Sequence, residues 1–91
     1  MFHRGKVLRW IEALESCGPN LSRPYADIVR GKIRELRITF GGTHYRLLYF
    51  FDGKRIVITH GFIKKTDQVP VQELERAERL MYEWKDYGEK G

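Results

Sequence analysis

Hydrophobic and polar positions alternate through the middle of the chain, which is the pattern of strands in an antiparallel sheet. In the segment 33–40, residues 36–40 alternate strictly between hydrophobic and polar side chains. Residues 43–51 and 54–63 are further hydrophobic runs of strand length. The pairs Gly41-Gly42 and Asp52-Gly53 separate the three runs, and both suit two-residue hairpin turns. The pattern predicts a three-stranded, or larger, antiparallel meander.

Helical spacing of hydrophobic residues flanks this central region. It predicts an amphipathic helix over about residues 5–17, ended by Gly18-Pro19. Residues 18–31 are predicted to be turn and loop. A second helix starts near Pro70, a residue suited to the first helical position. Together these elements predict an α+β fold in a single domain, residues 1–91, with the meander packed against an N-terminal and a C-terminal helix.

The first predicted turn places two arginines opposite each other. If Gly41-Gly42 forms the loop, Arg37 on one strand faces Arg46 on the next. Like charges in directly opposite positions destabilise a sheet. The pair therefore needs a counter-ion, which is either a bound anion or the neighbouring carboxylate of Glu35. A phosphate flanked by apolar and aromatic side chains is typical of proteins that bind single-stranded nucleic acid.

The second predicted turn assigns the remaining side chains to the two faces of the sheet. If Asp52-Gly53 forms the loop, Arg46 lies opposite Thr59. One face is then hydrophobic and forms the core under the helices, and His60 belongs to it as a buried, hydrogen-bonded histidine opposite Tyr45. The other face carries the polar and charged side chains, which are Glu35, Arg37, Thr39, His44, Arg46, Arg55, Thr59 and Lys65.

Charge and composition narrow the classes of function. Residues 23–65 contain ten basic and three acidic residues, whereas residues 66–91 contain four basic and seven acidic ones. The excess of positive charge in residues 23–65 favours an anionic partner, and nucleic acid is the leading candidate. The alternative is a basic surface that is simply exposed to solvent. No hydrophobic run approaches the ~20 residues that span a membrane. The single cysteine, Cys17, and the lack of a Cys/His cluster predict a cytoplasmic protein without a disulfide, metal or cofactor.

Four motifs together resemble the RelE/ParE superfamily of type II toxins, and its HigB-like, phage-related branch most closely. They are E-L-R at 35–37, Y-R-L-L-Y-F at 45–50, H-G-F-I-K-K-T at 60–66 and Pro70 opening the last helix. Residues 6–29 are also similar to that branch. Family members usually begin with a strand and a further helix before the helix that starts here near Gly5. We therefore expect a reduced sheet with an exposed edge, which a second copy or an antitoxin can cover.

The resemblance implies a toxin that cleaves mRNA in the ribosomal A site without a metal. It also implies a cognate antitoxin, usually with a helix-turn-helix domain, that holds the toxin inactive. Two alternatives exist on the same scaffold. One is a ParE-like gyrase inhibitor, and the other is an inactive, truncated relic that binds only antitoxin or operator DNA.

The motifs, together with the predicted faces of the sheet, suggest roles for individual residues. Arg46, the Y-R arginine, offers a planar fork for charge on the phosphate in the transition state, and Arg37 positions the same or an adjacent phosphate. Lys65 shares the face of Arg46 and is the candidate general base, because nearby cations favour a neutral amine. RNA contacts are assigned to Lys64, His44 and Arg55, with His44 as a further candidate acid or base. Plain contact with the RNA backbone stays open for both lysines.

Overall fold

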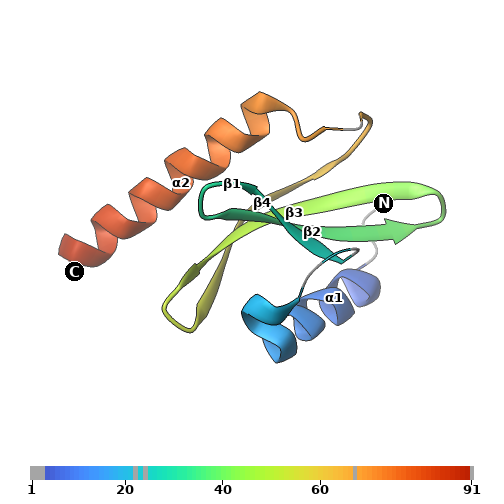
Figure 1. Cartoon of the computed structure of the whole chain (residues 1–91), viewed down its shortest axis with the longest axis horizontal. Coiled ribbons are helices and arrows are strands. Elements are labelled where there is room, and N and C mark those ends of the chain that lie inside the picture. Colours follow the sequence, from blue (N-terminus) through green and yellow to red (C-terminus); the bar gives the residue numbers. More distant parts are fainter. Residues whose placement is uncertain (1–3, 22, 24, 67, 91) are drawn as a thin grey trace.

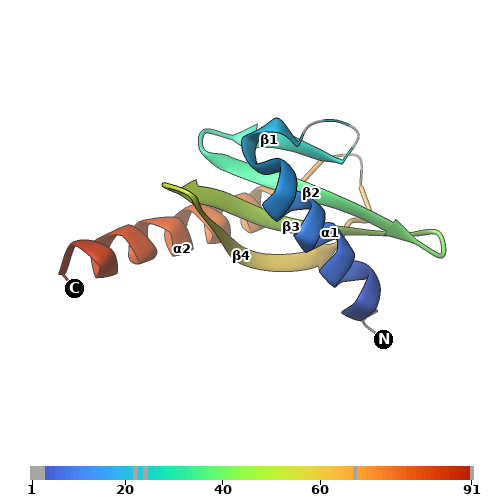
Figure 2. The same cartoon turned by 90° about the horizontal axis from the view of Figure 1, so that it is seen from below.

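The computed structural model describes residues 4–21, 23, 25–66 and 68–90. A four-stranded antiparallel sheet, in the order β1-β2-β3-β4, lies between two helices that cover opposite faces (Figures 1 and 2). The α+β fold and both helices are as predicted. The elements are α1 (Arg4–Cys17), the short 3₁₀ helix η1 (Gly18–Asn20), β1 (Ala26–Arg30), β2 (Ile33–Phe40), β3 (Thr43–Asp52), β4 (Arg55–Ile63) and α2 (Val71–Lys90).

Strand β1 corrects the prediction of a loop over residues 18–31. It pairs antiparallel with β2, and Ala26, directly opposite Leu36, is buried. The strand has five residues, and its register with β2 shifts between Ile28 and Arg30. So short an edge strand offers little alternation to detect, and it is stabilised by its hydrogen bonds to β2 rather than by local preference.

Two hydrophobic clusters, one on each face, replace the single core face that was predicted. The cluster under α1 contains Leu14, Ala26, Leu36, Ile38, Leu47 and Tyr49. The cluster under α2 contains Ile33, Leu48, Phe50, Ala77 and Met81. Successive side chains of a strand point to opposite faces, so the run from Leu47 to Phe50 supplies both clusters. Strand β3 is therefore the buried centre of the domain.

The register of the second hairpin differs from the prediction. Asp52 pairs with Arg55, so Gly53-Lys54 is the loop, with Gly53 at φ +61°. A bulge at Thr59 then shifts the pairing, because Tyr49 lies opposite Ile58 but Leu48 lies opposite His60. Beyond the bulge the side chains change faces. Arg46 therefore pairs with Phe62 rather than with Thr59, and His60 and Phe62 face α2 rather than α1.

The glycine of the H-G-F motif lies directly against the side chain of Leu47. Gly61 pairs with Leu47, and a Cβ at Gly61 would lie 2.6 Å from Leu47 Cδ2. We expect Gly61→Ala to lower the free energy of unfolding by about 1–3 kcal/mol, measured by urea denaturation. The double variant with Leu47→Ala should lose less than the sum of the two single losses. A Gly61→Ala protein more stable than the wild type would contradict this steric explanation.

Candidate functional site

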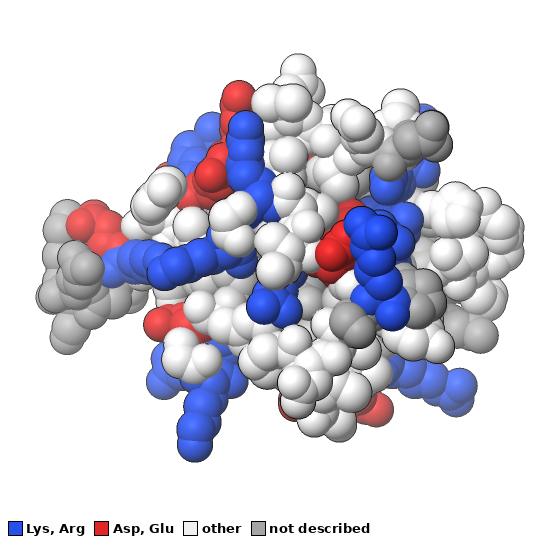
Figure 3. Space-filling model, viewed as in Figure 1, with Lys and Arg blue, Asp and Glu red and all other residues white. Residues whose placement is uncertain are grey.

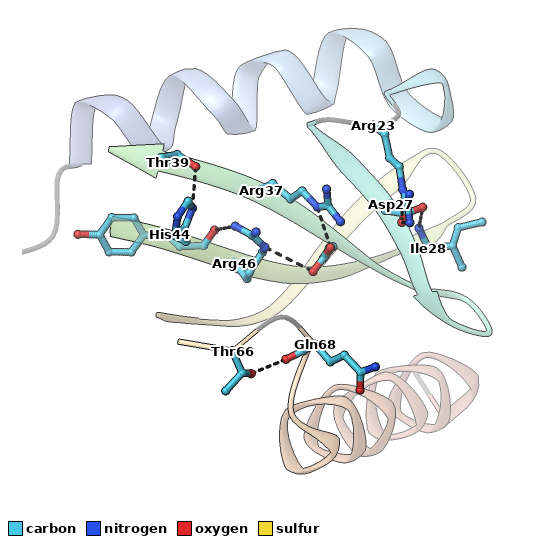
Figure 4. A network of polar contacts seen from close by, with 11 residues as sticks. Arg23, Asp27, Ile28, Arg37, Thr39, His44, Arg46, Thr66 and Gln68 are labelled. Carbon is cyan, nitrogen blue, oxygen red and sulfur yellow. Dashed lines mark hydrogen bonds and ion pairs between the residues drawn. The ribbon is translucent and has the colours of Figure 1, made fainter. Parts of the chain in front are cut away.

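The two arginines of the central hairpin share one buried carboxylate. Arg37 and Arg46 are directly opposite each other, as predicted from the Gly41-Gly42 turn. Arg37 Nε donates a hydrogen bond of 2.8 Å to Glu35 Oε1, and Arg46 Nε lies 3.5 Å from Glu35 Oε2 (Figure 4). Glu35 is only 2% exposed. The sequence left open whether a bound anion or Glu35 is the counter-ion of this pair, and in the structure Glu35 contacts both arginines.

Arg46 is buried to an unusual degree for an arginine, being 7% exposed. Its Nη1 donates a hydrogen bond of 3.0 Å to the carbonyl oxygen of Tyr45. Burial lowers the pKa of Arg46, the charge of Glu35 opposes that shift, and the charge of Arg37 adds to it. The guanidinium is thus held by the backbone and by a carboxylate, and its orientation is fixed before any ligand binds.

A cleft of ≈ 270 Å³ brings four of the predicted site residues together. It is lined by His44, Arg46, Lys64, Lys65 and Thr66. The backbone N–H of Lys64 donates to the carbonyl oxygen of His44 at 2.8 Å, which ties the segment after β4 to β3. Strand β4 ends at Ile63, so strict alternation no longer separates the two lysines. Both reach the cleft that contains Arg46; we call it the Arg46 cleft.

A second cleft, of ≈ 320 Å³, adjoins the first through Lys64, which lines both. We call it the Arg37 cleft. Its walls come from β1, β2 and the segment leading to α2, and they are Arg23, Asp27, Ile28, Val29, Glu35, Arg37, Lys64, Gln68, Val69 and Leu74. Sequence reasoning missed this cleft because β1 was predicted to be a loop. The β-branched pair Ile28-Val29 was the available signal.

Both carboxylate oxygens of Asp27, in the Arg37 cleft, accept hydrogen bonds from the protein. Arg23 Nε donates to Asp27 Oδ2 at 2.7 Å, and the backbone N–H of Ile28 donates to Oδ1 at 2.9 Å. The hydrogen bond from Arg23 is the main cause of a lowered pKa for Asp27. This cleft therefore combines fixed positive and negative charges with hydrophobic walls.

Arg55 lies apart from the other predicted site residues. It pairs with Asp52 next to the β3–β4 turn, about 20 Å along the strand from Arg46. There it lines a separate groove of ≈ 610 Å³ together with Ile56, Ile58 and Trp84. This groove is larger than the two clefts, but it contains neither the arginine pair nor the lysine pair. The structure does not bring Arg55 into the site.

His60 is the buried, hydrogen-bonded histidine that was predicted, although its partner is on α2 and not near Tyr45. Its side chain is 7% exposed, and Nε2 lies 3.0 Å from Glu73 Oε2. The bulge at Thr59 turns the ring toward α2. This pair therefore joins the sheet to the first turn of the helix.

Removing the helix side of this pair should be measurable. We expect Glu73→Ala to lower the free energy of unfolding by about 1–3 kcal/mol, because the buried Nε2 loses its acceptor. Urea denaturation monitors the loss. Glu75→Ala, an exposed change on the same helix, should shift stability by less than about 0.5 kcal/mol. Equal effects of both changes would contradict the role assigned to the pair.

The surface seen in Figure 3 carries basic side chains interspersed with acidic ones, not one uninterrupted basic patch. The described part of the chain contains no group of three or more His, Cys, Asp or Glu residues placed to hold a metal ion. None of its helices is long and hydrophobic enough to span a membrane. In the Arg46 cleft, by contrast, every charged side chain of the lining is basic.

A four-stranded antiparallel sheet with a helix on each face, and a basic cleft beside a buried arginine, define a small α+β protein with a candidate anion site. A family model described as "Phage derived protein Gp49-like (DUF891)" matches residues 2–82. The chain belongs to this phage-derived family, which is part of the RelE/HigB-type toxin group. No curated protein and no solved structure matches the chain.

Proposed function

We propose that the protein is the toxin of a type II toxin-antitoxin system, of the HigB-like branch, and that it cleaves mRNA on the ribosome without a metal. The observation that supports this function best is the Arg46 cleft. There a pre-oriented guanidinium meets His44, Lys64 and Lys65 in one small basic cavity. Membership in a toxin-like family is consistent with this chemistry.

The proposed reaction is a transfer of the phosphate within the RNA. The 2′-hydroxyl oxygen attacks the adjacent phosphorus and forms a new O–P bond while the bond from phosphorus to the 5′-oxygen breaks. The 2′-hydroxyl gives its proton to a base, and the leaving 5′-oxygen receives one from an acid. The products are a 2′,3′-cyclic phosphate and a 5′-hydroxyl end.

Each residue of the cleft has a proposed task in this reaction. Arg46 stabilises the negative charge that grows on the phosphate oxygens, since a guanidinium offers two parallel donors. Lys65 and His44 line the same cavity and supply the proton transfers. Lys64, shared by the two clefts, holds the RNA backbone, and Arg37 contacts the next phosphate. Arg55 has no task at this cleft.

A cognate antitoxin, which we expect to carry a helix-turn-helix domain, is the proposed regulating partner. Strand β4 is an edge of the sheet, with strand β3 on one side only. An unpaired edge is a template for another strand, so β4 is the proposed place for antitoxin or a second copy of the chain.

Primer extension on a reporter mRNA in a cell-free translation system tests the function. The expected result is a set of cuts that appears only when ribosomes are present. Inhibition of DNA gyrase without RNA cuts would support the ParE-like alternative. The absence of both activities would support the inactive relic.

A further inference from the structure

Glu35 is the carboxylate that both arginines face, Arg37 at 2.8 Å and Arg46 at 3.5 Å. We propose, building on the proposed function, that Glu35 competes with the RNA phosphate for the two guanidinium groups and thereby sets the affinity of the site for phosphate. Glu35 is thus a positioning residue, because it acts through Arg37 and Arg46 and not on the reacting atoms.

The balance of charge around Glu35 supports this competition. One carboxylate serves two guanidinium groups, so the three side chains together carry a net charge of +1. Lys64 links the clefts on which both arginines open. The site therefore keeps an excess of positive charge for an anion, and Glu35 reduces this excess by one. Replacing the carboxylate by an amide of the same shape raises the net charge of the three side chains to +2.

The geometry shows that the two arginines are not held equally. Glu35 Oε1 accepts a 2.8 Å hydrogen bond from Arg37, whereas the contact between Oε2 and Arg46 Nε is 3.5 Å long. Neither Glu35 Oε2 nor Arg46 Nε makes a hydrogen bond within the described part of the chain. Buried polar atoms are normally hydrogen-bonded, and a carboxylate and a guanidinium usually pair at shorter distances.

This loose contact fits an arginine that can exchange its counter-ion. Arg46 is attracted by Glu35 strongly enough to remain oriented, but it has not formed the tight pair that a phosphate would have to break. A phosphate oxygen in the Arg46 cleft would satisfy the guanidinium in place of Oε2. Glu35 then weakens binding of the ground-state phosphate, while the larger charge of the transition state still recruits Arg46.

The change Glu35→Gln tests this competition. The ligand is a 2′-O-methyl RNA oligonucleotide, which lacks the attacking hydroxyl, and its binding is followed by fluorescence anisotropy. We expect Glu35→Gln to lower Kd by about three- to tenfold, because one repelling charge near the phosphate is gone. The cleavage reaction should show a lower KM together with a lower kcat, since Arg46 loses its anchor. A purely structural role predicts weaker binding, because Arg46 would then be disordered.

Two further variants keep the test decisive. Glu78→Gln also removes one negative charge from a carboxylate paired with an arginine, at 3.0 Å from Arg30, but that pair is not part of either cleft. It should change Kd by less than about twofold. Glu35→Asp keeps the negative charge but places the carboxylate farther from Arg46, because the side chain is shorter. This variant replaces Glu35→Gln in the test if Glu35→Gln does not fold. Its Kd should lie between the wild-type value and that of Glu35→Gln, and a Kd at or above the wild-type value would overturn the proposal.

Inorganic phosphate separates this proposal from the proposed function. We expect phosphate to raise the Tm of Glu35→Gln more than that of the wild-type protein, whether or not either protein cuts RNA. A larger phosphate effect without RNA cleavage would uphold the counter-ion role and reject the nuclease. Ribosome-dependent cleavage by the wild type, combined with unchanged or weaker anion binding in Glu35→Gln, would reject the counter-ion role alone.

Discussion

Replacing Arg46 by alanine is expected to reduce RNA cleavage by about 100- to 1000-fold, the size of effect seen when one donor to a developing oxyanion is removed. The physical reason is the position of the guanidinium. Arg46 is 7% exposed and is oriented by the Tyr45 carbonyl oxygen and by Glu35, so its charge acts without a reorganisation cost. The rate is measured as appearance of the cut product in a cell-free translation system.

Two comparison variants identify the cause of that loss. Arg46→Lys keeps the charge but not the planar fork, and it should retain only part of the activity, with a loss of about tenfold or more. Arg79→Ala removes an exposed arginine on α2 and should leave the rate unchanged within about twofold. The fold should survive in Arg46→Ala, because Glu35 keeps its hydrogen bond from Arg37. Full activity in Arg46→Ala would contradict the role of Arg46.

The largest expected effect on stability comes from the cluster under α2. Phe50 is 1% exposed and belongs to the same cluster as Ala77 and Met81 of the helix. Phe50→Ala should lower the free energy of unfolding by about 3–5 kcal/mol, through lost burial and the cavity left behind. Small domains have only about 5–15 kcal/mol in all, so the urea midpoint should fall sharply.

The control for this change is on the same helix-sheet layer. Val71 opens α2 and is 57% exposed, so Val71→Ala should change stability by less than about 0.5 kcal/mol. A loss below about 1 kcal/mol in Phe50→Ala would contradict the structure, because it would mean that α2 does not cover this face of the sheet.

The central hairpin could be predicted from the sequence because its register is fixed locally. Gly41 and Gly42, at φ +57° and +80°, form a two-residue turn, and such a turn pairs Phe40 with Thr43. That pairing placed Arg37 opposite Arg46, and the neighbouring Glu35 followed from parity alone. The position of Arg46 relative to Arg37 and Glu35 could therefore be predicted from the residues of this one hairpin.

The register of the second hairpin could not be predicted because both its turn position and a bulge in β4 differ from a regular Asp-Gly hairpin. Asp-Gly is a common turn pair, but here Gly53 is the first loop residue and Asp52 stays in the strand. The bulge at Thr59 has no signal in the sequence, and its Oγ1 donates to the Leu48 carbonyl oxygen at 3.0 Å. One extra residue in a strand exchanges its faces, which is why His60 was assigned to the wrong side.

The shape of the clefts depends on contacts between distant segments. Lys64 lies between them because its backbone N–H bonds to the His44 carbonyl oxygen, and Gln68 and Val69 reach the Arg37 cleft from the approach to α2. Asp27 and Ile28 come from β1, which was predicted as loop. Pairings of this kind depend on tertiary packing rather than on spacing along the chain. The residue types of the site were predictable, but its second cleft was not.

The most direct test of the proposed function is cleavage of an mRNA held on a stalled ribosome with a vacant A site. Wild-type protein is added, and the cut position and the ends of the products are mapped, with Arg46→Ala in parallel. We expect a cut within the A-site codon that leaves a 2′,3′-cyclic phosphate, no cut when a tRNA occupies the A site, and no cut by Arg46→Ala. Equal cutting of free and ribosome-bound mRNA, or equal activity of the two proteins, would contradict the proposal.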